Sequence, residues 1–444
     1  MTKQQISLRD NHTRWTNDFC PLTTDYDREF LRFLSSHTVH ELAKEKGLLV
    51  YPESFNQGDG NNTVLTLQEN TEGVSDIVFT SNIMGFIGNE NTDIFIHSRF
   101  GSKNNDNFLH YMLMRIAGIN IFDMNVSSNK EEKFYDLLKF LFPRMLCDAL
   151  KQGVIKTYVN NSYNDSNLKG HIDIAKHIRK NKPRNGKVAY DVREYSLDNN
   201  ITELIRHCIE FIRKQHIGRN LLSANKEVRD AVRTIESVTV GYNSHDTQQL
   251  ISKNLKTPIH PLYAKYKPLQ RLCIAILSHE KYSYGSNNKK IHGILFDGAW
   301  LWEEYLSVVL KEDWKHYTSG THRLLSYSGH PFQPIIPDYI SRDKTKVGDA
   351  KYMWLQDRKG LDIDRAEAVY YKTIMYMYRF NSNRGYLMFP SNQDNSFRSF
   401  EIVETNGKLN MLGLKIDESE DFDEFCHQMR KNEERFIQYT KQLL

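Results

Sequence analysis

The chain has 444 residues, more than one ordinary core accommodates, so we expect two or three domains. Its 39% hydrophobic and 26% charged residues are typical of a globular protein, and a net charge of +4 permits a nucleic-acid partner without requiring one. Five scattered cysteines without C-x-x-C spacing argue against a zinc ribbon or a disulfide framework, and without a secretion signal or a membrane-length apolar run we expect a cytoplasmic protein with no membrane partner.

Residues 1–125 are expected to form a β-rich domain. Residues 26–46 place apolar side chains at helical spacing and end at Gly47, which predicts one helix. Short β-branched or apolar runs follow, and clusters of Gly, Asn and Ser between them indicate turns. These predicted strands are residues 48–51, 63–67, 77–79 and 93–97.

Residues 126–285 are expected to form a mainly helical middle region. Amphipathic patterns predict helices at residues 131–152, 198–216, 220–238 and 267–279, and the Asp-Asn-Asn run at 198–200 is a suitable N-cap. A basic segment, 176–193, lies between the first two helices. It is either a solvated loop or a surface that contacts DNA phosphates. The basic residues in question are Lys176, Arg179, Lys180, Lys182, Arg184 and Lys187.

Residues 286–444 are expected to form an α/β domain that begins after the turn-forming run at 285–290. Asp297 is predicted to cap a helix, a second helix is expected at 364–380, and a terminal helix from Glu420 onward. Strands are predicted at residues 324–327, 335–341, 347–352, 385–389, 397–405 and 408–416.

The most informative pattern is Pro337-Asp338 followed by Asp349-Ala350-Lys351. Because strand side chains alternate between faces, Asp349 and Lys351 are expected on one side of their strand. If residue 338 lies on the preceding strand of a hairpin, the two carboxylates meet. Carboxylate oxygens suit Mg²⁺, and a neighbouring ammonium can orient or activate water. The pattern favours metal-dependent cleavage of a phosphodiester.

Three neighbouring segments could extend this site. Glu303 or Glu304, on the helix before the strands, could add a carboxylate, with Glu303 preferred; the alternative is an exposed surface pair. Lys372 and Tyr376 are four apart and share a helix face, where they could contact DNA or support Lys351. The tyrosines nearby could equally be packing residues. The chain contains no phosphate-loop, dinucleotide-binding, serine-hydrolase or zinc-protease motif.

These residues resemble the McrC family, the nuclease subunits of modification-dependent McrBC restriction systems. Residues 302–306 are similar to that family's Phe-Glu-x-Phe-Val helix, and 337–338 and 349–352 to its PD and D-A-K-Y strands. Residues 168–173 are similar to its L-x-G-x-I-D segment. Residues 371–376 are similar to its Tyr-Gln-x-x-x-Tyr helix, except that Lys372 stands where glutamine is usual.

The resemblance implies an α+β multidomain protein with a C-terminal PD-(D/E)xK restriction-endonuclease-like domain. It implies a prokaryotic, Mg²⁺-dependent DNA endonuclease, with Mn²⁺ as a substitute, in which Asp338, Asp349, Glu303 and the Ala350 carbonyl hold the metal and Lys351 positions water. It further implies double-stranded, modified DNA as substrate and an McrB-like AAA+ GTPase ring as partner, docked on the N-terminal domain; the chain itself is expected to bind no nucleotide. Two alternatives stay open: a catalytically silent activator of the ring, and a stand-alone nuclease.

Overall fold

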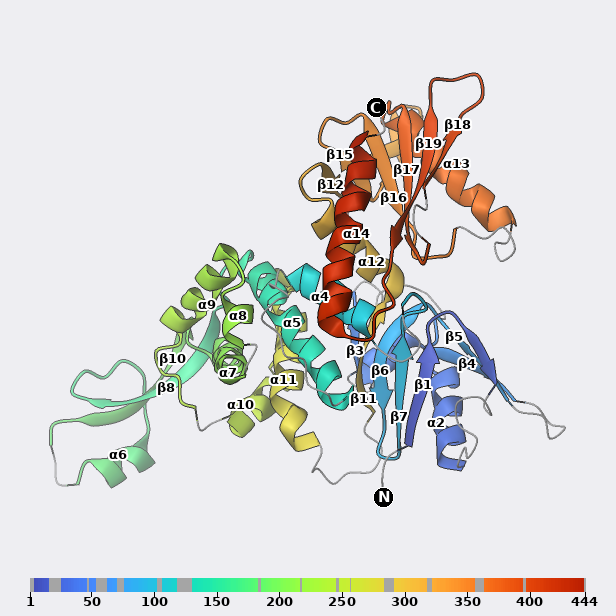
Figure 1. Cartoon of the computed structure of the whole chain (residues 1–444). Coiled ribbons are helices and arrows are strands. Elements are labelled where there is room, and N and C mark those ends of the chain that lie inside the picture. The colour runs from blue at the N-terminus through green and yellow to red at the C-terminus, as the bar shows by residue number, and fades with distance from the viewer. Residues whose placement is uncertain are drawn as a thin grey trace. The chain divides into compact units, whose positions relative to one another are not determined.

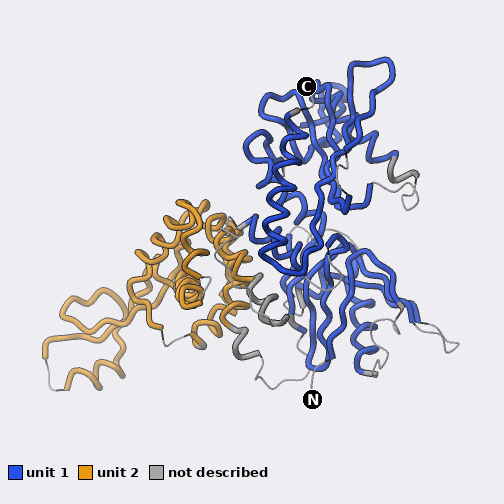
Figure 2. Tube along the Cα trace, in the orientation of Figure 1, with its two compact units in different colours: residues 1–116, 287–444 blue, residues 117–286 orange. Residues whose placement is uncertain are grey.

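A computed structural model describes most of the chain and divides it into two compact units. Unit 1 combines residues 1–116 with residues 287–444, and unit 2 is residues 117–286 (Figure 2). The first and last of the three expected domains therefore share one compact unit. The described residues are 4–15, 25–45, 48–52, 62–69, 76–101, 106–117, 130–182, 185–215, 218–244, 247–255, 257–282, 291–317, 322–355, 363–393 and 397–442.

The first sheet of unit 1 is built from both ends of the chain. Its strand order is β1-β7-β6-β11-β3, in which β11 pairs antiparallel with β6 and parallel with β3 (Figure 1). Gly85 and Gly293 face each other's strands at positive φ, where an added Cβ would lie 2.1 Å from a backbone oxygen. The strands are β1 (Gln4–Arg9), β3 (Leu49–Tyr51), β6 (Ile83–Gly88), β7 (Thr92–His97) and β11 (His292–Asp297).

Two helices replace the single helix expected over residues 26–46, and that prediction was wrong. Helix α2 (Asp25–Ser36) ends before Thr38, and α3 (Val39–Glu45) begins after it. Thr38 and Glu41 form reciprocal bonds, since the Thr38 N–H donates to the Glu41 carboxylate (2.8 Å) and the Glu41 N–H donates to the Thr38 hydroxyl (3.2 Å). This capping box starts a new helix inside a continuous apolar pattern. A small sheet completes this part, with β2 (Thr13–Trp15), β4 (Leu65–Gln68) and β5 (Ile77–Thr80).

The main sheet of residues 287–444 has the order β12-β15-β16-β17-β19-β18. Strands β16, β17 and β19 run parallel at its centre, and the outer strands are antiparallel. Four predicted strands match β16, β17, β18 and β19. The elements are β12 (Trp314–His316), β15 (Tyr339–Ser341), β16 (Lys346–Ala350), β17 (Arg384–Ser391), β18 (Phe397–Glu401), β19 (Lys408–Lys415), α12 (Gly298–Val309), α13 (Ile363–Arg379) and α14 (Phe422–Gln442).

One predicted strand of this sheet, residues 335–341, was wrong in extent. Residues 335–338 lie outside regular strands, and the following strand begins at Tyr339. Just upstream, β13 (Arg323–Tyr327) and β14 (His330–Pro334) form a separate two-stranded hairpin. Pro334 and Pro337 bracket the irregular stretch, and proline restricts the residue before it and lacks a backbone donor. This irregular stretch carries Asp338.

Unit 2 is a helical cluster with a three-stranded sheet, ordered β8-β10-β9. The predicted N-cap is confirmed, because the Asn199 side chain accepts bonds from the N–H groups of Ile201 and Thr202. The predicted helices of this unit are also present, although residues 220–238 divide between α8 and α9. The elements are α5 (Lys130–Leu150), α6 (Ile174–Lys180), α7 (Asn200–Lys214), α8 (Gly218–Leu222), α9 (Lys226–Val238), α10 (Thr247–Asn254), α11 (Tyr266–Tyr282), β8 (Thr157–Asp165), β9 (His171–Ile172) and β10 (Val188–Ser196).

Two remaining expectations concern cysteines and membranes. The four cysteines in the described part of the chain, Cys147, Cys208, Cys273 and Cys426, are buried free thiols, as expected. Across the described ranges, no helix combines the length and apolar character needed to cross a membrane. The turn-forming run at 285–290 lies outside the described residues.

Candidate active site

The β15–β16 hairpin brings Asp338 beside the strand that carries Asp349. Tyr339 pairs with Gly348 across the two strands, so Asp338, one residue earlier, lies level with Asp349. The Asp338 Oδ2 atom accepts a hydrogen bond of 2.7 Å from the Ala350 N–H. This bond fixes the Asp338 carboxylate against β16 although Asp338 is not itself part of a strand. The two carboxylates of the sequence pattern are thereby neighbours.

The Asp349 carboxylate is fully buried and is held between two lysines. Its side chain has 0% exposure, the Lys351 ammonium forms an ion pair with Oδ2, and the Lys372 ammonium lies 3.5 Å from Oδ1. Lys351 also donates to the Ala350 carbonyl at 3.3 Å. The alternation expected for a strand therefore places Asp349 and Lys351 together. Charged groups buried in this way are stable only when they are paired.

Glu303, on α12, interacts electrostatically with Asp338 and Asp349. Its pKa is raised to about 8, chiefly by burial and next by the Asp338 charge, while Lys351 opposes the shift and Asp349 adds to it. Burial also raises the pKa of Asp338 to about 7, with the Asp349 charge as the next cause. Tyr339 donates its hydroxyl hydrogen bond to the Glu303 carbonyl, which ties α12 to the hairpin. The raised pKa values favour the neutral forms of Glu303 and Asp338, whereas Asp349 is paired with Lys351 and Lys372.

The donor set fits a hard divalent cation. Carboxylate and carbonyl oxygens are the ligands that Mg²⁺ prefers, and a cation would favour the charged forms of Glu303 and Asp338, which burial and then carboxylate repulsion disfavour. Within the described ranges, no three His, Cys, Asp or Glu side chains converge closely enough to hold a metal by themselves. The Lys351 and Lys372 ammonium groups lie beside the two Asp349 carboxylate oxygens, which a bound metal ion would also contact. The fit therefore rests on the chemistry of the donors.

The three supporting residues of the sequence pattern have different surroundings. Lys372 of α13 lies 5.4 Å above the Tyr376 ring and pairs with Asp349. Tyr376 is 4% exposed and donates to the Ile336 carbonyl at 2.9 Å, which holds the irregular stretch before Asp338. Glu304 is also buried, at 6% exposure. The alternative of an exposed glutamate pair is therefore wrong for Glu304.

The predicted basic segment lies in unit 2, beginning on α6 and ending in β10. Lys176 is engaged by two carboxylates, at 3.0 Å from Asp173 and 3.2 Å from Asp191. Gly170, in the L-x-G-x-I-D segment, packs so closely that a Cβ would lie 2.2 Å from the Asp191 carbonyl oxygen. The exposed basic residues are Arg179, Lys180, Lys182 and Lys187, whereas Arg184 lies outside the described residues.

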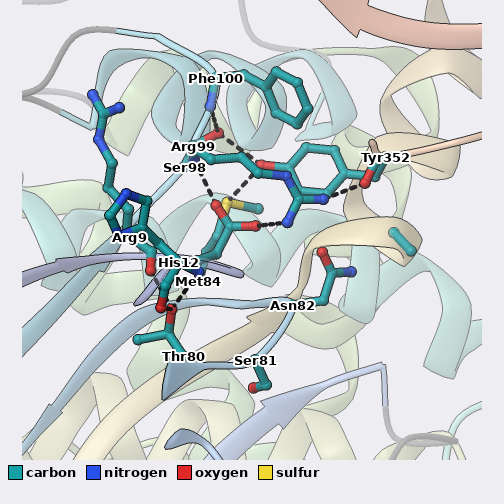
Figure 3. A network of polar contacts seen from close by, with 12 residues as sticks. Arg9, His12, Thr80, Ser81, Asn82, Met84, Ser98, Arg99, Phe100 and Tyr352 are labelled. Atoms are coloured by element: carbon teal, nitrogen blue, oxygen red, sulfur yellow. Dashed lines mark hydrogen bonds and ion pairs between the residues drawn. The ribbon is translucent and has the colours of Figure 1, made fainter. Parts of the chain in front are cut away.

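A second cluster, which the sequence pattern did not reveal, surrounds Tyr352 just after the candidate site (Figure 3). Arg99 donates to the Tyr352 carbonyl and to Asp10 Oδ2, the latter at 2.9 Å. Its guanidinium lies 4.6 Å from the centre of the Tyr352 ring, and the Tyr352 hydroxyl bonds Ser98 at 2.7 Å. Asp10 follows β1 and Arg99 follows β7, so only the parallel pairing of these strands brings them together.

Comparison with known proteins identifies a family. The family model described as "McrBC 5-methylcytosine restriction system component" matches residues 78–390, which is more than half of the chain. No curated protein matches.

Two solved structures, both from Thermococcus gammatolerans, are similar to the chain. An assembly of McrB AAA+ hexamers with bound McrC has 15% identity and a TM-score of 0.44, covering 97% of this chain and 100% of that one. The McrBC complex has 13% identity and a TM-score of 0.30, covering 72% and 90%. These low scores add no argument to the match of the family model. On that match, the chain belongs to the McrBC family of 5-methylcytosine restriction system components.

Proposed function

We propose that this chain is the McrC-type subunit of its restriction system and a metal-dependent DNA endonuclease of the PD-(D/E)xK class. The observation that supports this most is the gathering of Glu303, Asp338, Asp349 and Lys351 on one helix and one hairpin. Three carboxylates with an adjacent ammonium suit hydrolysis of a phosphodiester. Family membership adds independent support for a role in restriction.

The proposed mechanism assigns a role to each side chain. Asp338, Asp349, Glu303 and the Ala350 carbonyl would hold Mg²⁺ or Mn²⁺, which when bound supplies Lewis-acid activation of the phosphate and of water. Lys351 would donate hydrogen bonds to the attacking water and to the phosphate, stabilising the charge that develops in the transition state. Tyr376 would act as a positioning residue, because its bond to the Ile336 carbonyl fixes the segment that carries Asp338.

Lys372 has a specific place in this proposal. Its ammonium lies 3.5 Å from Asp349 Oδ1 and its side chain is 51% exposed, so it can reach both the site and bound DNA. A glutamine, usual at this position in the resembled family, would carry no charge. We therefore assign Lys372 a supporting role in holding the scissile phosphate.

The proposed partners follow from the family rather than from the site. We propose an McrB-like AAA+ GTPase ring, which this chain binds and stimulates, and modified double-stranded DNA as the substrate. The exposed lysines and Arg179 of the basic segment would contact DNA phosphates, and such contacts weaken steeply with salt.

The decisive experiment compares DNA cleavage by the wild-type chain and by two variants, Asp349→Ala and Lys351→Ala, with the partner GTPase, GTP and Mg²⁺ present. Each variant is expected to lose cleavage by at least about 100- to 1000-fold, because Asp349→Ala removes a proposed metal ligand and Lys351→Ala removes the ammonium that would stabilise transition-state charge. Lys315→Ala, an exposed lysine on β12, is the matched control and should cut normally. Undiminished cutting by either site variant contradicts the assignment.

The same assay separates the two alternatives. A catalytically silent activator would raise GTP turnover by the partner while even the wild-type chain cut no DNA. A stand-alone nuclease would cut DNA with Mg²⁺ when the partner is omitted. The proposed function instead requires both cleavage and stimulated GTP turnover in the complex, with only cleavage lost in Asp349→Ala.

A further inference from the structure

Unit 1 contains a pocket of about 350 Å³ that is separate from the three carboxylates. Two arginines and two aromatic rings contribute to its wall, together with polar groups that can donate or accept hydrogen bonds. Its lining residues are Arg9, Arg99, Phe100, Gly101, Trp354, Ser391, Asn392, Ile416 and Glu418. The volume suits one nucleotide and is far too small for a duplex.

The pocket lies at the carboxyl ends of the three central parallel strands. Trp354 follows the end of β16, Ser391 is the last residue of β17, and Ile416 directly follows β19. Ligands of open α/β sheets bind in this position, outside the carboxyl ends of the strands. Because Trp354 is three residues after Lys351, their Cα atoms are at most about 10 Å apart. The pocket is therefore close to the candidate active site.

The two aromatic side chains of the pocket wall pack against each other. The Trp354 ring packs on the buried Phe100 ring at 4.4 Å between centroids, yet Trp354 keeps 36% of its surface exposed. Phe100 is held in turn by the Arg99 guanidinium, 5.2 Å from its ring centre. An indole that packs on another ring and is partly exposed to solvent is the type of surface on which nucleic-acid bases stack.

The two arginines of the pocket differ in what they can bind. Arg99 is committed to Asp10 and the Tyr352 carbonyl, and its side chain is only 8% exposed (Figure 3). Arg9 makes one long hydrogen bond, of 3.4 Å, to the Gly101 carbonyl. Among the residues that the structure describes, no carboxylate forms an ion pair with Arg9. Arg9 is therefore the cation of this pocket that can receive a phosphate.

We propose that this pocket binds a single unpaired nucleotide of a DNA strand, with its base stacked on Trp354 and its phosphate on Arg9. The proposal rests on the proposed nuclease function and gives it a strand-binding subsite next to the cut. Asn392 and Glu418, which also line the pocket, offer an amide and a carboxylate to the polar edge of the base. Arg99 is a positioning residue that fixes Phe100 and the backbone at Tyr352.

The test is binding of a fluorescein-labelled thymidine 12-mer to the full chain in EDTA, followed by fluorescence anisotropy. A matched 12-mer of abasic sites carries the phosphates without bases. Trp354→Ala should weaken binding of the thymidine oligomer about 5- to 150-fold, the range for loss of one stacked base, and leave the abasic oligomer unaffected. Trp354→Phe should restore most of the loss, and Arg9→Gln should weaken both oligomers.

Tyr378→Ala and Arg398→Gln, an exposed aromatic residue and an exposed arginine of the same unit, serve as matched controls and should bind normally. Thermal unfolding shows that each variant is folded. Wild-type affinity in folded Trp354→Ala and Arg9→Gln overturns the proposal, as does equal weakening of both oligomers by Trp354→Ala.

Asp349→Ala separates this proposal from the nuclease assignment. It should fail to cut DNA in the complex, while Trp354→Ala should still weaken binding of the thymidine oligomer in EDTA when it is introduced into the Asp349→Ala chain. If Asp349→Ala cuts normally and Trp354→Ala loses binding, the nuclease assignment fails and the pocket stands. If Asp349→Ala loses cutting and Trp354→Ala binds normally, the pocket fails and the nuclease assignment stands.

Discussion

At the scale of single residues, the candidate site concentrates charge at a cost to stability. The pKa values of Glu303 and Asp338 are raised, first by burial and then by neighbouring carboxylates, so both groups resist ionisation in the folded chain. A raised carboxyl pKa means that the folded state binds protons more tightly than the unfolded state. Functional sites commonly hold such unfavourable arrangements because the rest of the fold supports them.

The first prediction concerns the stability of Asp338→Asn. The pKa of Asp338 is about 7 in the folded chain against 3.8 for an ordinary aspartate, so the wild-type chain loses stability as pH rises between these two values. Asp338→Asn keeps an oxygen for the Ala350 N–H and removes the charge. In EDTA near pH 8, the free energy of unfolding of the variant should exceed that of the wild-type chain by on the order of 1 to 2 kcal/mol, as measured by urea unfolding. Near pH 4 the two values should match.

Asp343→Asn, in the turn of the same hairpin, is the control of opposite sign. A hydrogen bond from Ser341 lowers the pKa of Asp343, so its charged form is favoured by folding. Asp343→Asn should therefore lose stability near pH 8. Destabilisation by Asp338→Asn at that pH would contradict the prediction, because it would mean that the folded chain stabilises the charged form of Asp338.

At the scale of elements, one buried carboxylate joins three helices of unit 1. Glu433 of α14 is 3% exposed and accepts bonds from Tyr305 of α12 at 2.7 Å and from Tyr111 of α4 (Asn107–Ala117) at 2.8 Å. Arg115 of α4 forms a bidentate ion pair with Glu433, with N–O distances of 3.1 and 2.7 Å. Because α12 also carries Glu303, this junction helps to position the site.

The second prediction is that Glu433→Ala destabilises unit 1 by about 3 to 5 kcal/mol, since it leaves a largely buried arginine and two buried hydroxyls without their acceptor. Urea unfolding of the full chain measures the change. Glu434→Ala, the exposed neighbour on α14, should change stability by less than about 0.5 kcal/mol. A small effect of Glu433→Ala would mean that water replaces the carboxylate.

At the scale of the whole molecule, the first sheet of unit 1 requires a strand that follows unit 2 in the sequence. Strand β11, formed by residues 292–297, lies between β6 and β3. Without β11, β3 loses its only strand partner in the described sheet order, and β6 becomes an edge. Exposed edges of buried strands are unstable and prone to aggregation.

The third prediction follows from this sheet. Residues 1–116 expressed alone should fail to fold, whereas co-expression with residues 287–444 should restore a soluble complex of the two pieces, since together they form one compact unit. Co-purification through a tag on one piece, followed by circular dichroism, measures this. A folded and monomeric 1–116 fragment would show that β11 is dispensable to the sheet.

Local patterns predicted most of the elements and placed Asp338, Asp349 and Lys351 together. The helix caps at Asn199 and Asp297 and the strand with Asp349 depend on neighbours within a few residues, so periodicity and capping preferences suffice. Local patterns failed where a short-range polar bond interrupts an apolar repeat, as at Thr38 and Glu41. They also failed at residues 335–338, which an apolar pattern alone does not distinguish from a strand.

The sequence by itself determined that Asp338 and Asp349 of the candidate site lie together, because they are close in the chain and a turn brings them level. Only the tertiary structure decided which distant residues surround them. Arg9, Arg99 and Trp354 are separated by up to hundreds of positions and carry no shared motif, yet strand pairing between β1 and β7 and packing against the end of β16 gather them at one pocket. Such contacts depend on the path of the whole chain, which local periodicity does not encode.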